Sequence, residues 1–93
     1  MSERKTETRL VMEVKRAGGM AVKFVSPGTN GMPDRLLLFP DGKMAFVEVK
    51  DKGQKPRPLQ LKQHTLLMNM GFRVYVLDDE RQITKIIEEV KNA

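Results

Sequence analysis

Cysteine and tryptophan are absent from this chain, and aromatic residues make up only 5% of it. Without cysteine there are no disulfides, thiolate zinc sites or cysteine nucleophiles, and the fold does not depend on the redox state of its compartment. No apolar run approaches the length of a membrane span, and the charged residues 1–10 lack the apolar segment of a signal peptide. These absences predict a cytoplasmic protein, and the short length predicts one domain over residues 1–93.

Positive charge is what the chain has in excess. Seventeen Lys and Arg residues outnumber twelve Asp and Glu residues, which gives a formal net charge of +5. The resulting positive potential attracts polyanions such as nucleic acid, although many small proteins are basic without binding one. A chain of this size also builds a modest core, so a partner subunit is a reasonable expectation. Charge therefore points to nucleic acid only if a suitable site accompanies it.

Hydrophobic periodicity and turn signals predict an α/β fold with the element order α-β-β-β-α-β-α. The expected elements are helix 3–17, strand 20–26, strands 34–39 and 43–50, helix 58–70, strand 72–77 and helix 78–92. The turn sequence at residues 40–43 predicts that the second and third strands form an antiparallel hairpin. Because a helix joins the third strand to the fourth, these two should be parallel, in a mixed four-stranded sheet flanked by helices.

The hairpin carries the candidate chemistry. Alternation of side chains places Glu48 and Lys50 on one face of the third strand, and Asp34 begins the partner strand. If the two carboxylates meet, their repulsion costs stability unless a proton or a cation lies between them. Mg²⁺ takes oxygen ligands and is commonly held by one or two carboxylates, and the carbonyl oxygen of Val49 is a natural further ligand. The ammonium of Lys50 would stand beside the attacking water and the scissile phosphate.

Two helices add polar residues that point inward. At 100° per residue Glu7 lies about 60° from Leu10, inside the apolar stripe of the first helix, whereas Glu13 lies at its edge. Glu7 could bring a third carboxylate, either as a metal ligand or through a bound water. Gln60 on the second helix could bond Lys50, the attacking water or a phosphate oxygen. The apolar stripe expected on that second helix consists of Leu59, Leu66, Leu67 and Met70.

Each of these signals taken singly is more often an ordinary structural feature. Glu-x-Lys on a strand is usually a solvated face with a weak ion pair, and an acid after proline is usually a turn residue. Lys52, Lys55 and Arg57 could contact DNA phosphates, but they could equally belong to an ordinary exposed loop. His64 is expected in a surface or packing role. The methionines are expected to fill gaps in the core, among them Met32, Met44, Met68 and Met70. The conjunction of acids, lysine and inward polar residues favours a metal-dependent site.

The sequences "GMPD" and "VEVK" resemble the motif of the PD-(D/E)XK nuclease superfamily. The wider pattern of "NGMPDRLLLF", "FVEVKDKGQKPRPLQ" and "GFRVYVL" resembles the VRR-NUC family within it, from about Glu7 to Leu77. This resemblance implies a restriction-endonuclease-like core and metal-dependent hydrolysis of phosphodiester bonds in DNA. By position it assigns Asp34, Glu48 and the Val49 carbonyl to a metal ion, Mg²⁺ or Mn²⁺. It likewise assigns catalysis to Lys50, the helix glutamine to Gln60, and the first-helix acid to Glu7, with Glu13 as the competing choice.

Small free-standing members of this family resemble phage nucleases that act as homodimers on branched DNA, including four-way (Holliday) junctions. The resemblance therefore implies a homodimeric DNA endonuclease, working in a bacterial host cell if a phage encodes it. Two alternatives belong to other functional classes. One is a nuclease-like module that binds DNA without cutting it, and the other is a structural or interaction module of a phage assembly.

Overall fold

The computed structural model describes residues 2–93. Its helices and strands are α1 (Glu3–Arg16), β1 (Met20–Lys23), β2 (Arg35–Phe39), β3 (Lys43–Val49), α2 (Pro58–Asn69), β4 (Val74–Leu77) and α3 (Ile83–Lys91). Short 3-10 turns at Pro40–Gly42 and Glu80–Gln82 precede β3 and α3. The predicted element order is confirmed, with shorter first and last strands. None of the helices in the described part of the chain is long and apolar enough to cross a membrane.

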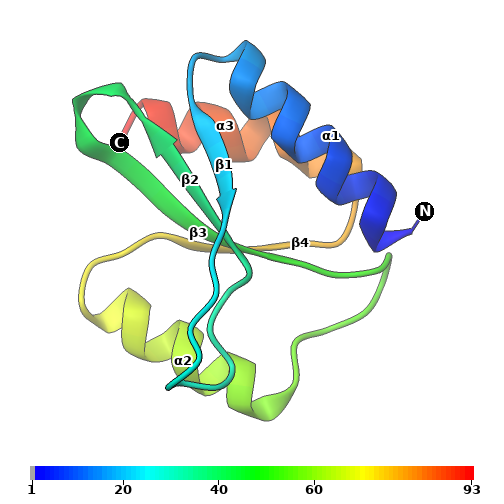
Figure 1. Ribbon diagram of the computed structural model, residues 1–93, viewed down its shortest axis with the longest axis vertical. Helices are drawn as coiled ribbons and strands as arrows, with labels where there is room; N and C mark the ends of the chain where they lie inside the picture. The colour runs from blue at the N-terminus through cyan, green and yellow to red at the C-terminus, as the bar shows by residue number, and fades with distance from the viewer. Residues whose placement is uncertain (1) are drawn as a thin grey trace.

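The four strands form one mixed sheet in the order β1-β2-β3-β4. β1 and β2 are antiparallel, as are β2 and β3, whereas β3 and β4 are parallel. The parallel pair is joined through α2, so the predicted crossover is confirmed. Figure 1 shows α1 and α3 on one side of the sheet and α2 on the other. The fold therefore has three layers, and the two faces of the sheet meet different helices.

The face covered by α1 and α3 holds the hydrophobic core. Ala45, Val47 and Val49 of β3 are fully buried there, as the alternation along this strand predicts. Leu10 and Val14 pack on them from α1. The α3 side chains of this core are Ile83, Ile86, Ile87 and Val90. Burial of this apolar cluster anchors the sheet and fixes the face on which Glu48 must emerge.

The opposite face is packed more thinly and is partly polar. Phe46 of β3 makes edge contacts with Phe24 and Phe72, with ring centroids 5.9 and 5.8 Å apart. Above the end of β3, α2 turns Gln60 and His64 toward the sheet, and both are buried. At the end of β3, the space between α2 and the sheet is therefore filled by polar side chains and not by a second apolar core.

The predicted apolar stripe of α2 is wrong in three of its four members. Leu67 is buried, but Leu59, Leu66 and Met70 are exposed. Helix geometry explains the error. Gln60 faces the sheet, and the three exposed residues project about 80–120° away from it around the helix axis. The burial expected for Met68 and Met70 is wrong for the same reason, since both are on the outer surface of α2.

The connection between β1 and β2 lies over α2, as Figure 1 shows. Gly31 sits so close to α2 that an added Cβ would meet Leu59 at 3.0 Å, and its φ of +86° also favours glycine. At the end of this connection the amide of Phe24 donates to the carbonyl of Asp34 at 2.9 Å. This bond extends the β1–β2 ladder by one residue and holds Asp34 at the tip of the sheet.

Candidate active site

Asp34 lies opposite Glu48 across the end of the hairpin. The last paired residues are Arg35 and Val47, so the next position on each strand is Asp34 and Glu48. Opposed residues of an antiparallel pair point to the same side of the sheet. The strand register therefore brings together two acids that are 14 positions apart in the sequence.

The backbone of Val49 holds Asp34 in place. The amides of Phe46 and Lys50 donate to the carbonyls of Arg73 and Leu77, so the amide of Val49 faces the opposite, β2 side. β2 has already ended there, and Asp34 Oδ1 accepts the hydrogen bond from Val49 N at 3.2 Å. Because the N–H and C=O of one strand residue face the same neighbour, the Val49 carbonyl also points to the Asp34 side. A carboxylate and a carbonyl oxygen thus converge beside Glu48.

Glu48 is almost completely buried beneath α2, with 4% of its surface exposed. Gln60 Nε2 donates to Glu48 Oε2 at 3.3 Å, and Lys50 Nζ lies 3.6 Å from the same oxygen. The amide of Gln60 cannot turn freely, because the Arg57 backbone N–H donates to its Oε1 at 2.8 Å. Gln60 therefore holds Glu48 rather than Lys50, and its orientation is set by the first turn of α2.

Burial and mutual repulsion raise the pKa values of both acids. Burial raises the pKa of Glu48 from 4.5 to about 7, and the charge of Asp34 adds to the rise, while Lys50 opposes it. Burial also raises the pKa of Asp34, against the hydrogen bond from Val49, and the nearby charge of Glu7 raises it further. Two carboxylates that resist ionisation together are suited to share a cation.

The donor set fits a hard divalent cation held by few protein ligands. Mg²⁺ prefers oxygen ligands and commonly keeps several waters beside one or two carboxylates. Asp34, Glu48 and the Val49 carbonyl supply such oxygens. Within residues 2–93 no group of three His, Cys, Asp or Glu side chains is arranged to hold a metal ion. The residues therefore fit a cation bound by a carboxylate pair, not a closed cage.

Glu7 reaches the site as half of an ion pair. Its Oε2 lies 2.9 Å from Nε of Arg35, whose NH1 donates to the carbonyl of Ala21. Sequence reasoning missed Arg35, which follows Asp34 directly and neutralises Glu7. It also missed Glu3, whose charge raises the pKa values of both Asp34 and Glu48. The charges of two acids from the first turns of α1 therefore act on the carboxylate pair.

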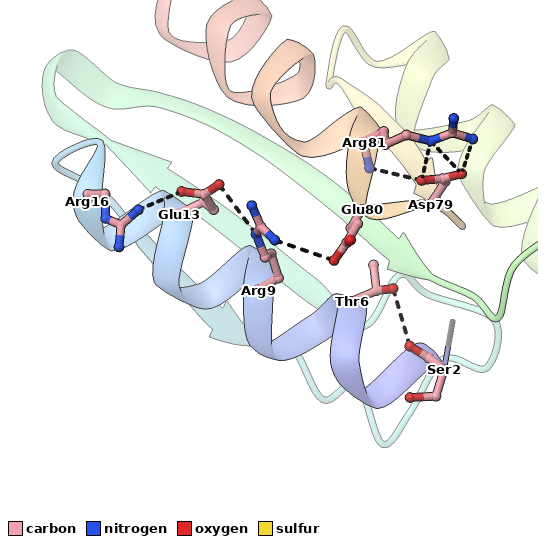
Figure 2. A network of polar contacts seen from close by, with 8 residues as sticks. All are labelled: Ser2, Thr6, Arg9, Glu13, Arg16, Asp79, Glu80 and Arg81. Carbon is pink, nitrogen blue, oxygen red and sulfur yellow. Dashed lines mark hydrogen bonds and ion pairs between the residues drawn. The ribbon is translucent and has the colours of Figure 1, made fainter.

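Glu13 belongs to a different part of the surface. Figure 2 shows Glu13 between Arg9 and Arg16, at 3.6 and 3.4 Å, with Arg9 reaching on to Glu80. This chain of ion pairs joins α1 to the turn before α3. Of the two acids considered for the first helix, Glu7 is therefore the one near Asp34.

His64 is the least expected neighbour of Glu48. It lies one turn after Gln60 on α2, is buried, and places Nε2 3.8 Å from Glu48 Oε1. Burial lowers the pKa of His64, and the charge of Lys50 lowers it further, which favours the neutral imidazole. Neither Nε2 nor Glu48 Oε1 has a hydrogen-bond partner. Leaving a buried polar group unpaired typically costs about 1–3 kcal/mol.

The basic loop after β3 is exposed at Lys52, Lys55 and Arg57. Lys52 Nζ lies 3.9 Å from Asp79 Oδ2, a loose surface ion pair. The loop passes the start of α1, where the Glu3 backbone N–H donates to the side chain of Asp51. The start of this loop is therefore tied to the first turn of α1.

Comparison with protein-family models gives no match. A phage protein named "Putative nuclease p44", from Acyrthosiphon pisum secondary endosymbiont phage 1, is 53% identical over 74 residues, which are 80% of each chain. A solved structure described as "VRR_NUC domain" superposes with a TM-score of 0.85 at 33% identity, covering 92% of this chain and 94% of that one.

Two acids lie at the end of a hairpin, beneath a helix that connects parallel strands. This arrangement places the chain in the α/β class with a PD-(D/E)XK-like core. The predicted fold class is thereby confirmed. Within that class the chain belongs to the VRR-NUC family.

The raised pKa of Glu48 predicts a pH-dependent cost to stability. The folded state keeps this proton up to about pH 7, whereas an ordinary glutamate loses it near 4.5. Between these values the unfolded state binds fewer protons, so the free energy of unfolding falls as pH rises. At about 1.4 kcal/mol per pH unit, the stability of Glu48→Gln relative to the native chain should rise by about 3 kcal/mol between about pH 4 and 8. Urea unfolding in EDTA measures this difference, and an equal difference at both pH values would contradict the assigned environment.

Proposed function

We propose that this chain is a divalent-metal-dependent endodeoxyribonuclease that hydrolyses phosphodiester bonds in branched DNA, including four-way junctions, as a homodimer. The observation that carries the proposal is the meeting of Asp34 and Glu48 at one end of the hairpin, with Lys50 Nζ 3.6 Å from Glu48. The name of the phage relative and the VRR-NUC fold support the nuclease activity in this proposal. Within this proposal the chain is one nuclease domain that works in the cytoplasm of a bacterial host, with Mg²⁺ as the cation and Mn²⁺ as a substitute.

The residues of the site divide the work between them. Asp34, Glu48 and the Val49 carbonyl would hold the cation, and Glu7, itself paired with Arg35, lies near Asp34. A cation held there would supply positive charge that neutralises the phosphate and polarises the bond to be broken. Lys50 donates hydrogen bonds to the attacking water and to a phosphate oxygen, and so stabilises the charge that develops in the transition state. Gln60 keeps Glu48 in position through its bond to Oε2.

Lys50→Ala should lower the rate of DNA cleavage by about 10²- to 10³-fold, because it removes one preorganised charge from the transition state. Asp34→Asn should abolish cleavage, since it removes half of the carboxylate pair. The measurement is cleavage of labelled four-way junctions, flaps and plain duplex with Mg²⁺, Mn²⁺ or EDTA. Branched substrates are expected to be cut faster than duplex, and only with a divalent cation.

Two matched variants control for charge and folding. Asp41→Asn changes the same residue type in the hairpin turn, where Asp41 has a φ of +67° that asparagine tolerates. Lys85→Ala removes an exposed lysine from α3, on the other side of the sheet. Both should cut like the native protein. Undiminished cleavage by Lys50→Ala would rule out the mechanism, and native protein that binds DNA without metal-dependent cleavage would favour a non-catalytic binding module.

The basic loop supplies phosphate contacts in this proposal. Lys52, Lys55 and Arg57 are exposed beside the site, where a DNA backbone entering it would pass. Removing one side chain that neutralises a phosphate should reduce the slope of log affinity against log salt by roughly 0.9 on duplex DNA. Replacing all three with alanine should therefore flatten the slope, as measured by fluorescence anisotropy in EDTA over a range of salt. A slope equal to that of Lys85→Ala would remove the loop from the interface.

Helix α2 supports the homodimer. Leu59, Leu66 and Met70 form an exposed apolar stripe on one side of this helix, about half or more of each residue's surface being open. Exposed apolar stripes of this kind mark interaction surfaces. A second copy that pairs through α2 would cover them and supply the second active site that two opposed strands of a junction require.

Leu66→Glu should convert the dimer to a monomer, because a charge would be buried in the centre of this stripe. Light scattering after size exclusion measures the mass directly. Thr65→Glu adds the same charge on an exposed position about 100° away and should leave the dimer intact. A native protein of monomeric mass, or a dimeric Leu66→Glu, would count against this interface.

A further inference from the structure

Two buried polar atoms without partners face each other behind the carboxylate pair. Within the described part of the chain, Glu48 Oε1 and His64 Nε2 are the buried side-chain atoms that lack any hydrogen-bond partner. They lie 3.8 Å apart, and the exposed fractions of the two residues are only 4% and 3%. The two atoms are therefore available to each other as hydrogen-bond partners, and solvent does not compete for either atom.

The chemistry of the two groups is complementary. An ionised carboxylate only accepts hydrogen bonds, whereas a neutral imidazole donates one from whichever nitrogen carries its proton. The observed 3.8 Å exceeds a hydrogen bond of about 2.7–3.2 Å by about 0.6–1.1 Å. Closing this gap requires a rotation of one or both side chains.

The arrangement on α2 extends the role already seen for Gln60. Gln60 and His64 are four residues apart, so they project from one face of the helix toward the same target. Gln60 donates to Glu48 Oε2, and His64 faces the other oxygen, Oε1. One helix face therefore presents a separate donor position to each oxygen of a single carboxylate.

We propose that His64 is a positioning residue, which donates Nε2–H to Glu48 Oε1 and, with Gln60, fixes the plane of this carboxylate for cation binding. The inference rests on the proposed function, because it assigns Glu48 to the cation. Each carboxylate oxygen can accept more than one bond, so these contacts leave capacity for the ion. Outer hydrogen-bond partners of this kind typically change metal affinity by about 10- to 100-fold.

The tautomer of His64 tests the contact without any substitution. His64 is the single histidine of the chain, so the imidazole ¹⁵N spectrum of the native protein contains one residue's signals. With saturating Mg²⁺, Nε2 should carry the proton and Nδ1 should not. A proton on Nδ1, or the averaged signal of a solvent-exposed histidine, would overturn the proposal.

Metal affinity tests the consequence. Mn²⁺ binding to the DNA-free protein, followed by electron paramagnetic resonance, should weaken by about tenfold or more in His64→Leu, which keeps the bulk but removes the donor. His64→Gln, which keeps a donor on a flexible chain, should restore most of that affinity. Thr65→Leu is the matched control, because the Thr65 hydroxyl bonds only within α2, to Leu61 O, and it should bind like the native protein.

The outcomes separate this inference from the proposed function. If the native protein cuts DNA and Asp34→Asn no longer binds Mn²⁺, while His64→Leu binds Mn²⁺ as tightly as the native protein, the positioning role is wrong and the nuclease stands. If the native protein neither binds Mn²⁺ nor cuts, the proposed function fails first. Should His64→Leu fail to fold, the His64→Gln affinity and the tautomer of the native protein decide the question.

Discussion

The repulsion between the carboxylates of Asp34 and Glu48 is the constraint around which this molecule is organised. Strand register opposes the two acids, and burial under α2 withholds the water that would otherwise screen them. The surrounding groups offset part of that cost. The Val49 amide bonds Asp34, and Gln60 and Lys50 approach one oxygen of Glu48. What remains is a site of raised pKa values, which a cation would relieve.

The three-layer fold separates stability from chemistry. On one face of the sheet, α1 and α3 bury aliphatic side chains of β3 completely, which makes the position of this strand rigid. On the other face, α2 gives up part of its apolar contact and turns Gln60 and His64 toward Glu48. The same strand therefore carries core residues and site residues alternately, so the core fixes where Glu48 and Lys50 can stand. The leucines on the outer side of α2 stay exposed.

The strands are predictable from sequence because their side chains alternate between two faces, which leaves few alternative assignments. In β3, one assignment of Val47 and Val49 to the core forces Glu48 to the opposite face, and the structure agrees. The buried face of α2 is harder to predict, since apolar residues lie on two sides of the helix. Most of its leucines are on the exposed side, so hydropathy alone selects the wrong face. Its orientation depends on Leu67 and on the polar contacts of Gln60, and neither signal stands out in hydropathy. For the same reason the sequence predicts only a surface or packing role for His64, and the partner that its buried ring meets does not follow from it.

The sequence by itself determined the element order, the hairpin, the alternation that pairs Glu48 with Lys50, and the family resemblance. These features depend on local periodicity, turn chemistry and short motifs, all of which are written along the chain. The tertiary structure alone decided which acid of α1 approaches Asp34, that Arg35 neutralises it, and that His64 faces Glu48. Such contacts join residues 16–28 positions apart, and they depend on how helices rotate against a sheet, which periodicity leaves undetermined.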